Sequence, residues 1–414
     1  MGYKKDAIKG ISWTSGGRFI TRGLAFLKIV VLARILNPSQ FGIFGIASLI
    51  LSFLETITET GINIILIQSK DELSQYINSA WVVSIIRGII ISTLIVISAP
   101  FIATFFHTPD ARNLLLLISL VPFVRGFINP SEVKFQKELK FHLQFWFDST
   151  LYIVDALTAI SVSLITHSVY ALVAGLLLSA FLEVILSFVF IEPRPRFIIE
   201  RRYFKDIFHK GIWITSYTVF NYIAENADNA VVGKLLGASA LGLYQMAYKI
   251  SILPITEISD VVGSVVFPVY AKIVDEPRRL KKAFFKTVFS VLFGSALLGI
   301  VIFFFPKQII LILLGSKWLS IAPVLKVLVL YSVIRTISGP ASALFLSLRK
   351  QKYVSEMIFI RFATLALAIY PFVKTYGLIG GGYSQLLSVL LETPVLILFA
   401  FLSFRKKSQD SKVL

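Results

Sequence analysis

The chain has 414 residues, of which 56% are hydrophobic and 15% are charged, and its formal net charge is +18. Soluble domains carry about 25% charged residues, and a soluble globule has too little interior to bury so much apolar surface. Apolar stretches long enough to cross a bilayer, which takes about 20 residues, recur along the whole chain. This composition excludes a soluble protein and predicts an all-α integral membrane protein.

Hydropathy predicts twelve transmembrane helices, and turn sequences separate several of them: NPSQ at 37–40, HTPD at 107–110 and GSKW at 315–318. In chain order the predicted spans are 10–34, 41–67, 78–106, 111–133, 141–166, 168–191, 211–235, 241–271, 284–306, 319–348, 353–373 and 377–404. Because the number of spans is even, both termini are expected on the same side of the membrane.

The basic residues alternate from loop to loop. Of the 41 Lys and Arg residues, 26 fall in one set of alternate loops and 6 in the other set. The positive-inside rule places the basic set in the cytoplasm, and with it both termini. The positive charge is therefore explained by the membrane topology and by the attraction of the basic loops to anionic membrane lipids. It does not predict a nucleic-acid partner.

One sequence pattern occurs twice. VLARILNPSQFGIFGIA at 31–47 aligns with VVGKLLGASALGLYQMA at 231–247, and VRGFINPS at 124–131 aligns with IRTISGPA at 334–341. We expect a duplicated six-helix unit whose copies cross the membrane in the same sense, so that a pseudo-twofold axis along the membrane normal relates two lobes around a central cavity. The predicted division is an N-terminal lobe at 1–195, a basic cytoplasmic linker at 196–210, a C-terminal lobe at 211–406 and a cytoplasmic tail at 407–414.

Charged residues inside a bilayer are costly and usually face a cavity or a partner. Arg18 and Arg22 share a face of the first predicted helix, and Glu55 and Glu59 share a face of the second. One interpretation is a hairpin held by ion pairs between these two sets. The other is a pair of guanidinium groups that binds a phosphate bidentately.

Four further arginines inside predicted spans are candidates for contact with an anionic substrate: Arg87, Arg125, Arg335 and Arg361. On the seventh predicted helix, Glu225 and Asp228 are three residues apart and share a face. These two carboxylates, and Glu55 and Glu59, are candidates for coupling to a Na⁺ or H⁺ gradient, and they are equally suited to neutralise the arginines. Lys28 is placed to snorkel to a helix end.

No enzyme site is predicted. The four histidines are scattered without metal-ligand spacing, and the chain has no cysteine. A Gly-rich phosphate loop followed by Lys and Ser or Thr is absent from the sequence. We therefore expect neither catalytic residues nor a bound metal or organic cofactor.

Several segments look like a known family. DNAVVGKLLGASALGLYQMAYKI at 228–250 is similar to a signature of bacterial polysaccharide flippases. Four more segments resemble the same family: NSAWVVSIIRG at 78–88, NPSEVKFQKELKF at 129–141, VVFPVYAKI at 265–273 and GSKWLSIAPVLKVL at 315–328. By this resemblance, which covers nearly the whole chain, the sequence is identified as a member of the polysaccharide transporter family of O-antigen and exopolysaccharide flippases. The family lies in the multidrug/oligosaccharidyl-lipid/polysaccharide exporter superfamily.

The resemblance implies a V-shaped transporter in a bacterial or archaeal cytoplasmic membrane. It implies a flippase that moves an undecaprenyl-pyrophosphate-linked oligosaccharide from the inner to the outer leaflet by alternating access, and it suggests other polysaccharide-assembly membrane proteins as partners. In relatives the first helix of each lobe lines the cavity, which supports Arg18 and Arg22. Glu225 and Asp228 depart from a purely basic site on the first helix of the second lobe.

Two alternatives remain at this point. The first is a cation-coupled extruder of drugs or small molecules from the same superfamily, which favours an acidic and aromatic cavity. The second is a membrane glycan polymerase or glycosyltransferase, which requires a sizeable catalytic loop. The basic residues inside the predicted spans argue against the first, and the short loops argue against the second.

Overall fold

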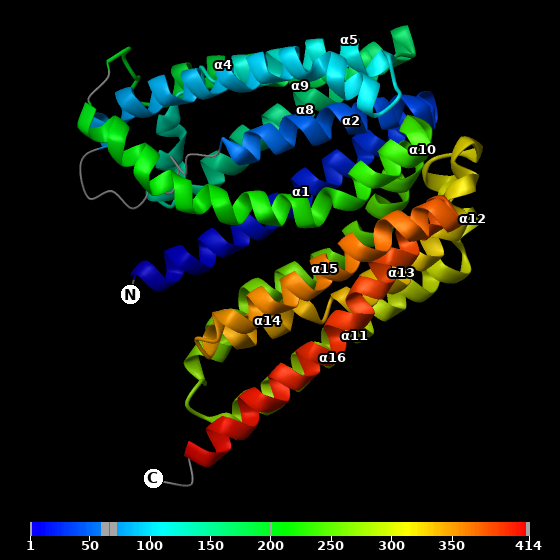
Figure 1. Cartoon of the computed structure of the whole chain (residues 1–414). Helices are drawn as coiled ribbons and strands as arrows, with labels where there is room; N and C mark the ends of the chain where they lie inside the picture. The colour runs from blue at the N-terminus through cyan, green and yellow to red at the C-terminus, as the bar shows by residue number, and fades with distance from the viewer. Residues whose placement is uncertain (1, 59–65, 67–72, 199–200, 411–414) are drawn as a thin grey trace. The chain divides into compact units, whose positions relative to one another are not determined.

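The computed structural model describes residues 2–58, 66, 73–198 and 201–410, and in parts of the helices it describes the backbone alone. All regular structure in these residues is helical. The chain divides into two compact units (Figure 1). The first unit comprises Met1–Asn226 and Gly237–Ser239, and the second comprises Ala227–Leu236 and Ala240–Leu414.

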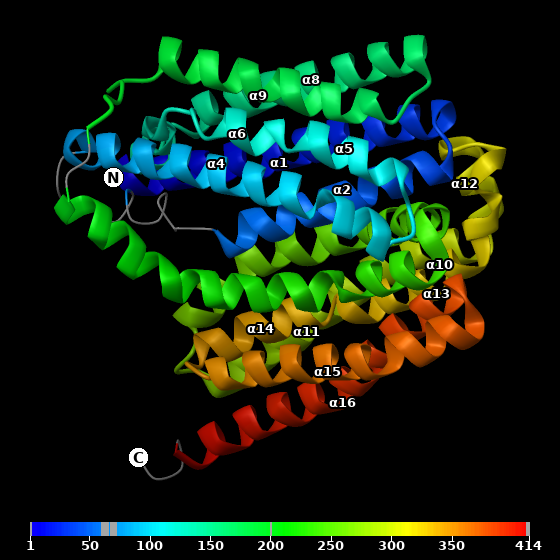
Figure 2. The same ribbon diagram turned by 45° about the horizontal axis from the view of Figure 1, so that its top comes forward.

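The first unit is a bundle of long and broken helices. Its elements are α1 Gly2–Ile35, α2 Pro38–Ile57, α4 Leu73–Phe105, α5 Asp110–Ile118, α6 Leu120–Arg125, η1 Pro130–Val133, α7 Lys134–Lys137, α8 Phe141–Thr166 and α9 Tyr170–Phe190. α8 and α9 lie side by side, α1 packs on α8, and α4 packs on α5 and α6 (Figure 2).

The predicted break at 37–40 is the start of α2. The side chain of Asn37 accepts a hydrogen bond from the backbone N–H of Gln40 at 2.9 Å, and the side chain of Gln40 accepts one from the backbone N–H of Asn37 at 2.9 Å. This capping box satisfies two N–H groups that the helix leaves open, and Pro38 at the first turn has no N–H to satisfy. The turn prediction at this site is confirmed.

The predicted span at 111–133 is not one straight helix. The chain forms α5, α6 and then η1, with a bend of 69° between Asp110–Arg125 and Pro130–Lys137. Proline disfavours helical backbone in the residue before it, and Asn129 is accordingly extended with φ −71° and ψ 113°. Because of this bend, the stretch 111–133 is a series of short helices that change direction.

The helix α10, Arg201–Lys272, is two helices joined at Gly237. Gly237 has φ 83°, a backbone conformation that glycine adopts without the steric penalty of a Cβ. The predicted spans at 211–235 and 241–271 lie on either side of this residue, so the predicted break between them is confirmed.

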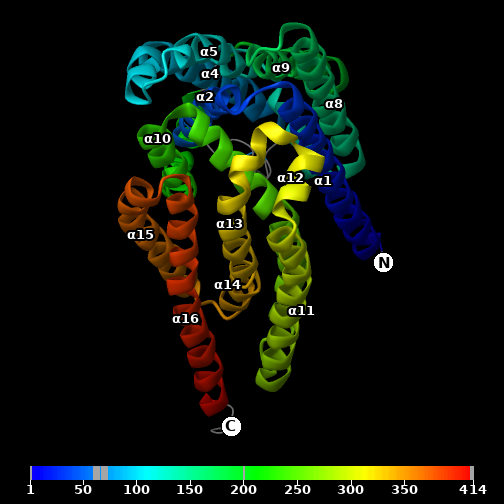
Figure 3. The same cartoon turned by 90° about the vertical axis from the view of Figure 1, so that its right-hand side faces the viewer.

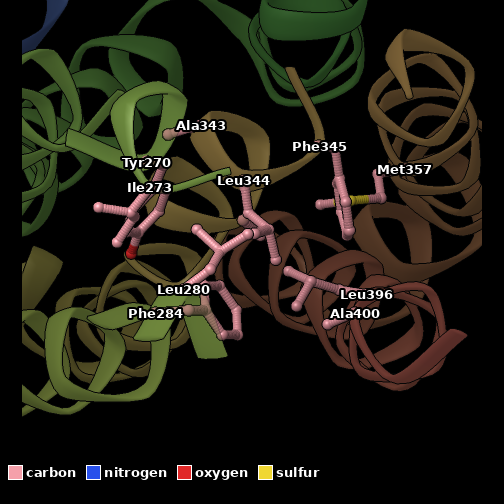
Figure 4. Packing of buried hydrophobic residues seen from close by; sticks show 11 residues of the cluster. Tyr270, Ile273, Leu280, Phe284, Ala343, Leu344, Phe345, Met357, Leu396 and Ala400 are labelled. Atoms are coloured by element: carbon pink, nitrogen blue, oxygen red, sulfur yellow. The ribbon is translucent and has the colours of Figure 1, made fainter. Parts of the chain in front are cut away.

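The second unit contains α11 Pro277–Phe304, α12 Pro306–Leu313, η2 Ser316–Ile321, α13 Ala322–Arg335, α14 Ser338–Ser347, α15 Gln351–Tyr376 and α16 Leu378–Asp410. α15 packs along α16, and α13 contacts both α16 and α11 (Figure 3). A cluster of buried apolar side chains joins α11, α14, α15 and α16, with Phe284, Leu344, Phe345 and Met357 among its members (Figure 4).

By length and apolar composition, nine helices of the described chain are able to cross a membrane, or ten if the bent pair counts as one span. The count takes Thr218–Ile252 as one helix although Gly237 breaks it. Large apolar side chains such as Ile165 and Leu367 are exposed, as expected for helices solvated by lipid. The chain is an all-α membrane protein, and twelve spans remain a prediction.

The two units share local features that the repeat predicts. Arg125 ends α6 and Arg335 ends α13, and the helix breaks after each of them. α8 and α15, the next long helices in their units, each have 26 residues. These features agree with a duplication. The pseudo-twofold axis, the central cavity, the linker at 196–210 and the other predicted lobe boundaries stay predictions.

Candidate functional site

A cavity of about 620 Å³ lies within the first unit. Its walls come from α2, α4, α6, α7, α8, α9, the bend after α6 and Tyr222 of α10. The charged lining residues are Glu55, Arg87, Arg125, Glu132 and Glu183. Three of these residues are predicted site residues: Glu55, Arg87 and Arg125. The bend at Asn129 and Pro130 brings the helices that carry them around one polar space.

Arg125 lies between two carboxylates. Its Nη1 is 3.8 Å from Glu55 Oε1 on α2, and its Nε is 3.7 Å from Glu183 Oε2 on α9. These distances are longer than a hydrogen bond, and within the described part of the chain the buried Nε has no hydrogen-bond partner. The Arg125 side chain is 39% exposed. The guanidinium group is therefore held electrostatically and keeps donor capacity for a ligand.

Arg87 stabilises the end of a helix. Its Nη2 donates to the backbone carbonyl of Glu55 at 2.6 Å, and its Nε donates to Thr58 Oγ1 at 3.1 Å. Thr58 is the C-cap of α2, where backbone carbonyls lack helical partners and carry partial negative charge. Arg87 thus lines the cavity, as a substrate-binding prediction requires, and also fixes the wall formed by α2.

Asn129 is a structural residue of the cavity that the sequence analysis did not single out. Its buried Nδ2 donates to the backbone carbonyls of Ser187 at 3.3 Å, Ile191 at 3.1 Å and Pro193 at 3.3 Å. These bonds tie the bend after α6 to the end of α9. The signal in the sequence was the Asn-Pro pair, which commonly initiates a turn.

In the second unit, Asp228 is fully buried and well bonded. Its Oδ2 accepts hydrogen bonds from Tyr244 Oη at 2.8 Å and Gln385 Nε2 at 2.7 Å, and its Oδ1 accepts one from the backbone N–H of Asn229 at 2.8 Å. Tyr244 and Asp228 lie on opposite sides of the break at Gly237, and Gln385 belongs to α16. The carboxylate therefore holds three helical segments together.

No feature of the sequence indicated that Gln385 belongs to a site, because it is a neutral amide in an apolar helix and is part of no charge pattern or motif. Glu225, the other predicted coupling residue on α10, is exposed. Asp228 is buried and is enclosed by donors from neighbouring helical segments.

The remaining predicted arginines of the second unit have local partners. Arg361 Nη1 lies 3.5 Å from Oε2 of Glu392, a carboxylate that is 1% exposed and whose Oε1 accepts a hydrogen bond from Ser338 at 3.2 Å. Arg335 Nη1 donates to Tyr331 Oη at 2.6 Å. Arg335 therefore supports its own helix, α13, and Arg361 links α15 to α16.

The arginines of the first helix are less fully described. Arg22 is exposed on α1. The side chain of Arg18 and the whole of Glu59 lie outside the described residues. The predicted pairing of these arginines with Glu55 and Glu59 and the alternative phosphate grip both stay predictions.

Lys28 does not snorkel. Its Nζ lies 2.7 Å from both carboxylate oxygens of Asp155 on α8, and the two side chains are 11% and 12% exposed. This ion pair fixes α1 on α8. No local sequence pattern indicated this pairing, since the two residues are 127 positions apart.

Comparison with known proteins gives a family. Residues 31–323 match the polysaccharide biosynthesis protein family. Lipopolysaccharide biosynthesis protein WzxC of Escherichia coli (strain K12) is 25% identical, covering 84% of this chain and 71% of its own length. Teichuronic acid biosynthesis protein TuaB of Bacillus subtilis (strain 168) is 23% identical, covering 83% of this chain and 71% of its own length.

Solved structures share the fold. The lipid II flippase MurJ in an inward closed conformation superposes with a TM-score of 0.76 at 17% identity, covering 96% of this chain and 90% of that one. An inward-facing multidrug resistance MATE family transporter of the MOP superfamily has a TM-score of 0.70 at 15% identity, covering 93% and 95%. Since the family match spans more than half of the chain, the protein belongs to the polysaccharide biosynthesis protein family and is a multi-pass membrane protein.

Proposed function

We propose that this protein is a flippase that moves an undecaprenyl-pyrophosphate-linked oligosaccharide, the repeat unit of an O-antigen or exopolysaccharide, from the inner to the outer leaflet by alternating access. The observation that carries the proposal is the polar cavity of the first unit, which places arginines and carboxylates among apolar membrane helices. The family match supports a role in polysaccharide export.

The physical problem of such a transporter is desolvation. A glycan and its pyrophosphate carry many polar groups, and each one buried in hydrocarbon without a partner costs several kcal/mol, roughly 2–7 by transfer measurements. A hydrated cavity lined by charged and hydrogen-bonding side chains lowers this cost while the prenyl chain stays in the lipid. The lining of the cavity in the first unit is of this kind.

In this proposal Arg18 and Arg22 of α1 bind the pyrophosphate, because paired guanidinium groups match its oxygens bidentately. Arg125, whose side chain lines the cavity and is 39% exposed, contacts the rest of the head group in this proposal. Arg87, which also holds the end of α2, lines the same cavity, and Arg335 and Arg361 of the second unit are further substrate-binding candidates in this proposal.

Coupling to a Na⁺ or H⁺ gradient is assigned in this proposal to Asp228. This carboxylate is enclosed between the two arms of α10 and α16, so a change in its charge would alter the contacts of all three segments. Glu225, which is exposed on the same helix, is the second candidate for coupling. Asp228→Asn keeps the side-chain shape, and we expect it to fold and to lose the dependence of export on the ion gradient.

The proposed setting is the cytoplasmic membrane of a bacterium or archaeon, with both termini and the segment at 192–210 facing the cytoplasm. The basic loops then face anionic lipid headgroups. Cysteines introduced at Ser408 and Ser316 are expected to react with impermeant reagents from opposite sides.

Deletion of the gene in its own host tests the function. We expect surface glycan to be lost and the lipid-linked oligosaccharide to accumulate in the cell, and we expect the gene in trans to restore export. The double variant Arg18→Ala, Arg22→Ala should insert but not export, whereas Arg112→Ala, an exposed arginine of α5, should export normally. A deletion strain with normal surface glycan and new sensitivity to cationic drugs would instead support a drug extruder.

The ion-pair alternative for the first helix needs its own variant. If Arg18 and Arg22 only neutralise Glu55 and Glu59, then replacing all four residues with neutral ones should restore folding and export. Export that stays absent in a well-folded quadruple variant would support the phosphate grip.

A further inference from the structure

The cavity of the first unit carries chemistry that the pyrophosphate grip does not use. Its volume, about 620 Å³, lies inside the range of about 300–1,000 Å³ that is typical of small-molecule sites. Carboxyl, amide and hydroxyl groups line it, among them Glu132, Glu183, Gln136, Gln144 and Ser84. A lining of this kind favours a ligand with many hydrogen-bonding groups.

The charges in the cavity do not suit a phosphate. Three carboxyl groups face two guanidinium groups, and Arg125 already lies between Glu55 and Glu183. Arg87 donates to the carbonyl of Glu55. An anionic group that entered this space would meet the carboxylates and would have to compete with them for the arginines. A ligand without negative charge avoids this repulsion.

We propose that this cavity binds the sugar part of the head group and that it accepts neutral and amino sugars while excluding acidic ones. The inference rests on the proposed function, since it assigns a second subsite for the same substrate. Sugar hydroxyls both donate and accept hydrogen bonds. Carboxylates accept from them, amides such as those of Gln136 and Gln144 do both, and the guanidinium group of Arg125, which lines the cavity, donates.

Two features hold the site in shape before a ligand arrives. Tyr222 is fixed by a hydrogen bond from its hydroxyl to the carbonyl of Leu49 at 2.7 Å, and its ring centroid lies 5.8 Å from that of Phe53. Asn129 locks the opposite bend to α9 through three carbonyls. Such preorganisation lowers the entropy cost of binding.

Binding of free disaccharides to the purified protein in detergent tests the proposal, with saturation-transfer NMR as the readout for weak ligands. The probes are the disaccharide of glucosamine, its N-acetylated form and a disaccharide of galacturonic acid, which are cationic, neutral and anionic. We expect saturation transfer to the first two and none to the third. Equal binding of all three, or a preference for the uronic acid, would overturn the proposal.

Variants locate the site. Glu183→Gln should weaken binding of the cationic probe by about tenfold, the effect of losing one charge-assisted hydrogen bond. Gln144→Ala should weaken both bound probes, and it keeps the test open if Glu183→Gln fails to fold. The matched control is Glu356→Gln on α15, whose carboxylate pairs with Lys352 outside the cavity. Unchanged binding in folded Glu183→Gln and Gln144→Ala would refute the location.

The binding and export results together distinguish failure of the sugar subsite from failure of the proposed flippase function. A protein that exports glycan in cells but shows no saturation transfer to any probe refutes the sugar subsite and leaves the flippase proposal standing. A protein that binds the neutral and cationic probes while its deletion leaves surface glycan intact supports the subsite and refutes the flippase.

Discussion

The cavity of the first unit and the Asp228 cluster of the second unit hold charge in different ways. Around the cavity, Arg125 lies 3.7 and 3.8 Å from its two carboxylates and is 39% exposed. In the Asp228 cluster, the carboxylate is fully buried and accepts hydrogen bonds of 2.7 and 2.8 Å from Gln385 and Tyr244. Arg125, the loosely held group, can still form hydrogen bonds with a ligand. The hydrogen-bonding positions of Asp228, the tightly bonded group, are occupied by neighbouring helices. If so, removing a tightly bonded group should cost more stability than removing a loosely held one.

The largest expected loss of stability comes from Lys28→Met. The variant leaves Asp155 buried without its cation, and breaking a buried ion pair costs about 3–5 kcal/mol. Thermal unfolding in detergent measures the loss. The matched double variant Lys28→Met, Asp155→Leu should recover most of it, because no charge is then left unpaired. A Lys28→Met variant as stable as the wild-type protein would contradict the expectation that tightly bonded charged groups stabilise the fold.

The next effect is that of Asp228→Ala. Tyr244 and Gln385 then lose a buried acceptor, and each unsatisfied buried donor costs about 1–3 kcal/mol. We expect a fall in unfolding temperature, measured as above. Tyr244→Phe removes one hydrogen bond and should lower stability by about 1 kcal/mol. A larger loss in Tyr244→Phe than in Asp228→Ala would contradict the view that the carboxylate organises the cluster.

The smallest effect on stability is expected for Arg125→Gln. Ion pairs of partly exposed groups contribute about 0–1 kcal/mol, so the unfolding temperature should hardly change. Export should nevertheless fall, because the guanidinium group that lines the cavity is lost. Measuring both quantities on one preparation sharpens the comparison. A strongly destabilised Arg125→Gln protein would place Arg125 with the tight, structural groups.

Local features of the fold could be predicted from the sequence, and pairings between distant helices could not. The capping box at Asn37 and the break between two helices near Gly237 depend on a few neighbouring residues, and the predictions there are confirmed. One interpretation of the sequence pairs Glu55 with the arginines of α1, and the structure places its carboxylate 3.8 Å from Arg125 of α6, a neighbour that no local pattern indicated. Which helix faces which depends on packing along the whole unit.

The candidate site shows the same limit. Arg87 and Arg125 were predicted because charges in apolar segments are rare and costly. Gln385 and Asn129 are neutral, so hydropathy and charge did not mark them. The pairing of Lys28 with Asp155 links α1 to α8, and no local pattern indicates which of several intramembrane carboxylates a lysine will meet.

Reconstitution tests the central claim most directly. The purified protein is placed in liposomes that contain an undecaprenyl-pyrophosphate-linked oligosaccharide with a fluorescent sugar, and an impermeant reagent quenches the label in the outer leaflet. The account predicts that the wild-type protein brings nearly all of the label within reach of the reagent. It predicts much slower exposure with Arg125→Gln and no acceleration with the double variant Arg18→Ala, Arg22→Ala. Liposomes with folded wild-type protein that protect half of the label, as protein-free liposomes do, would contradict the account.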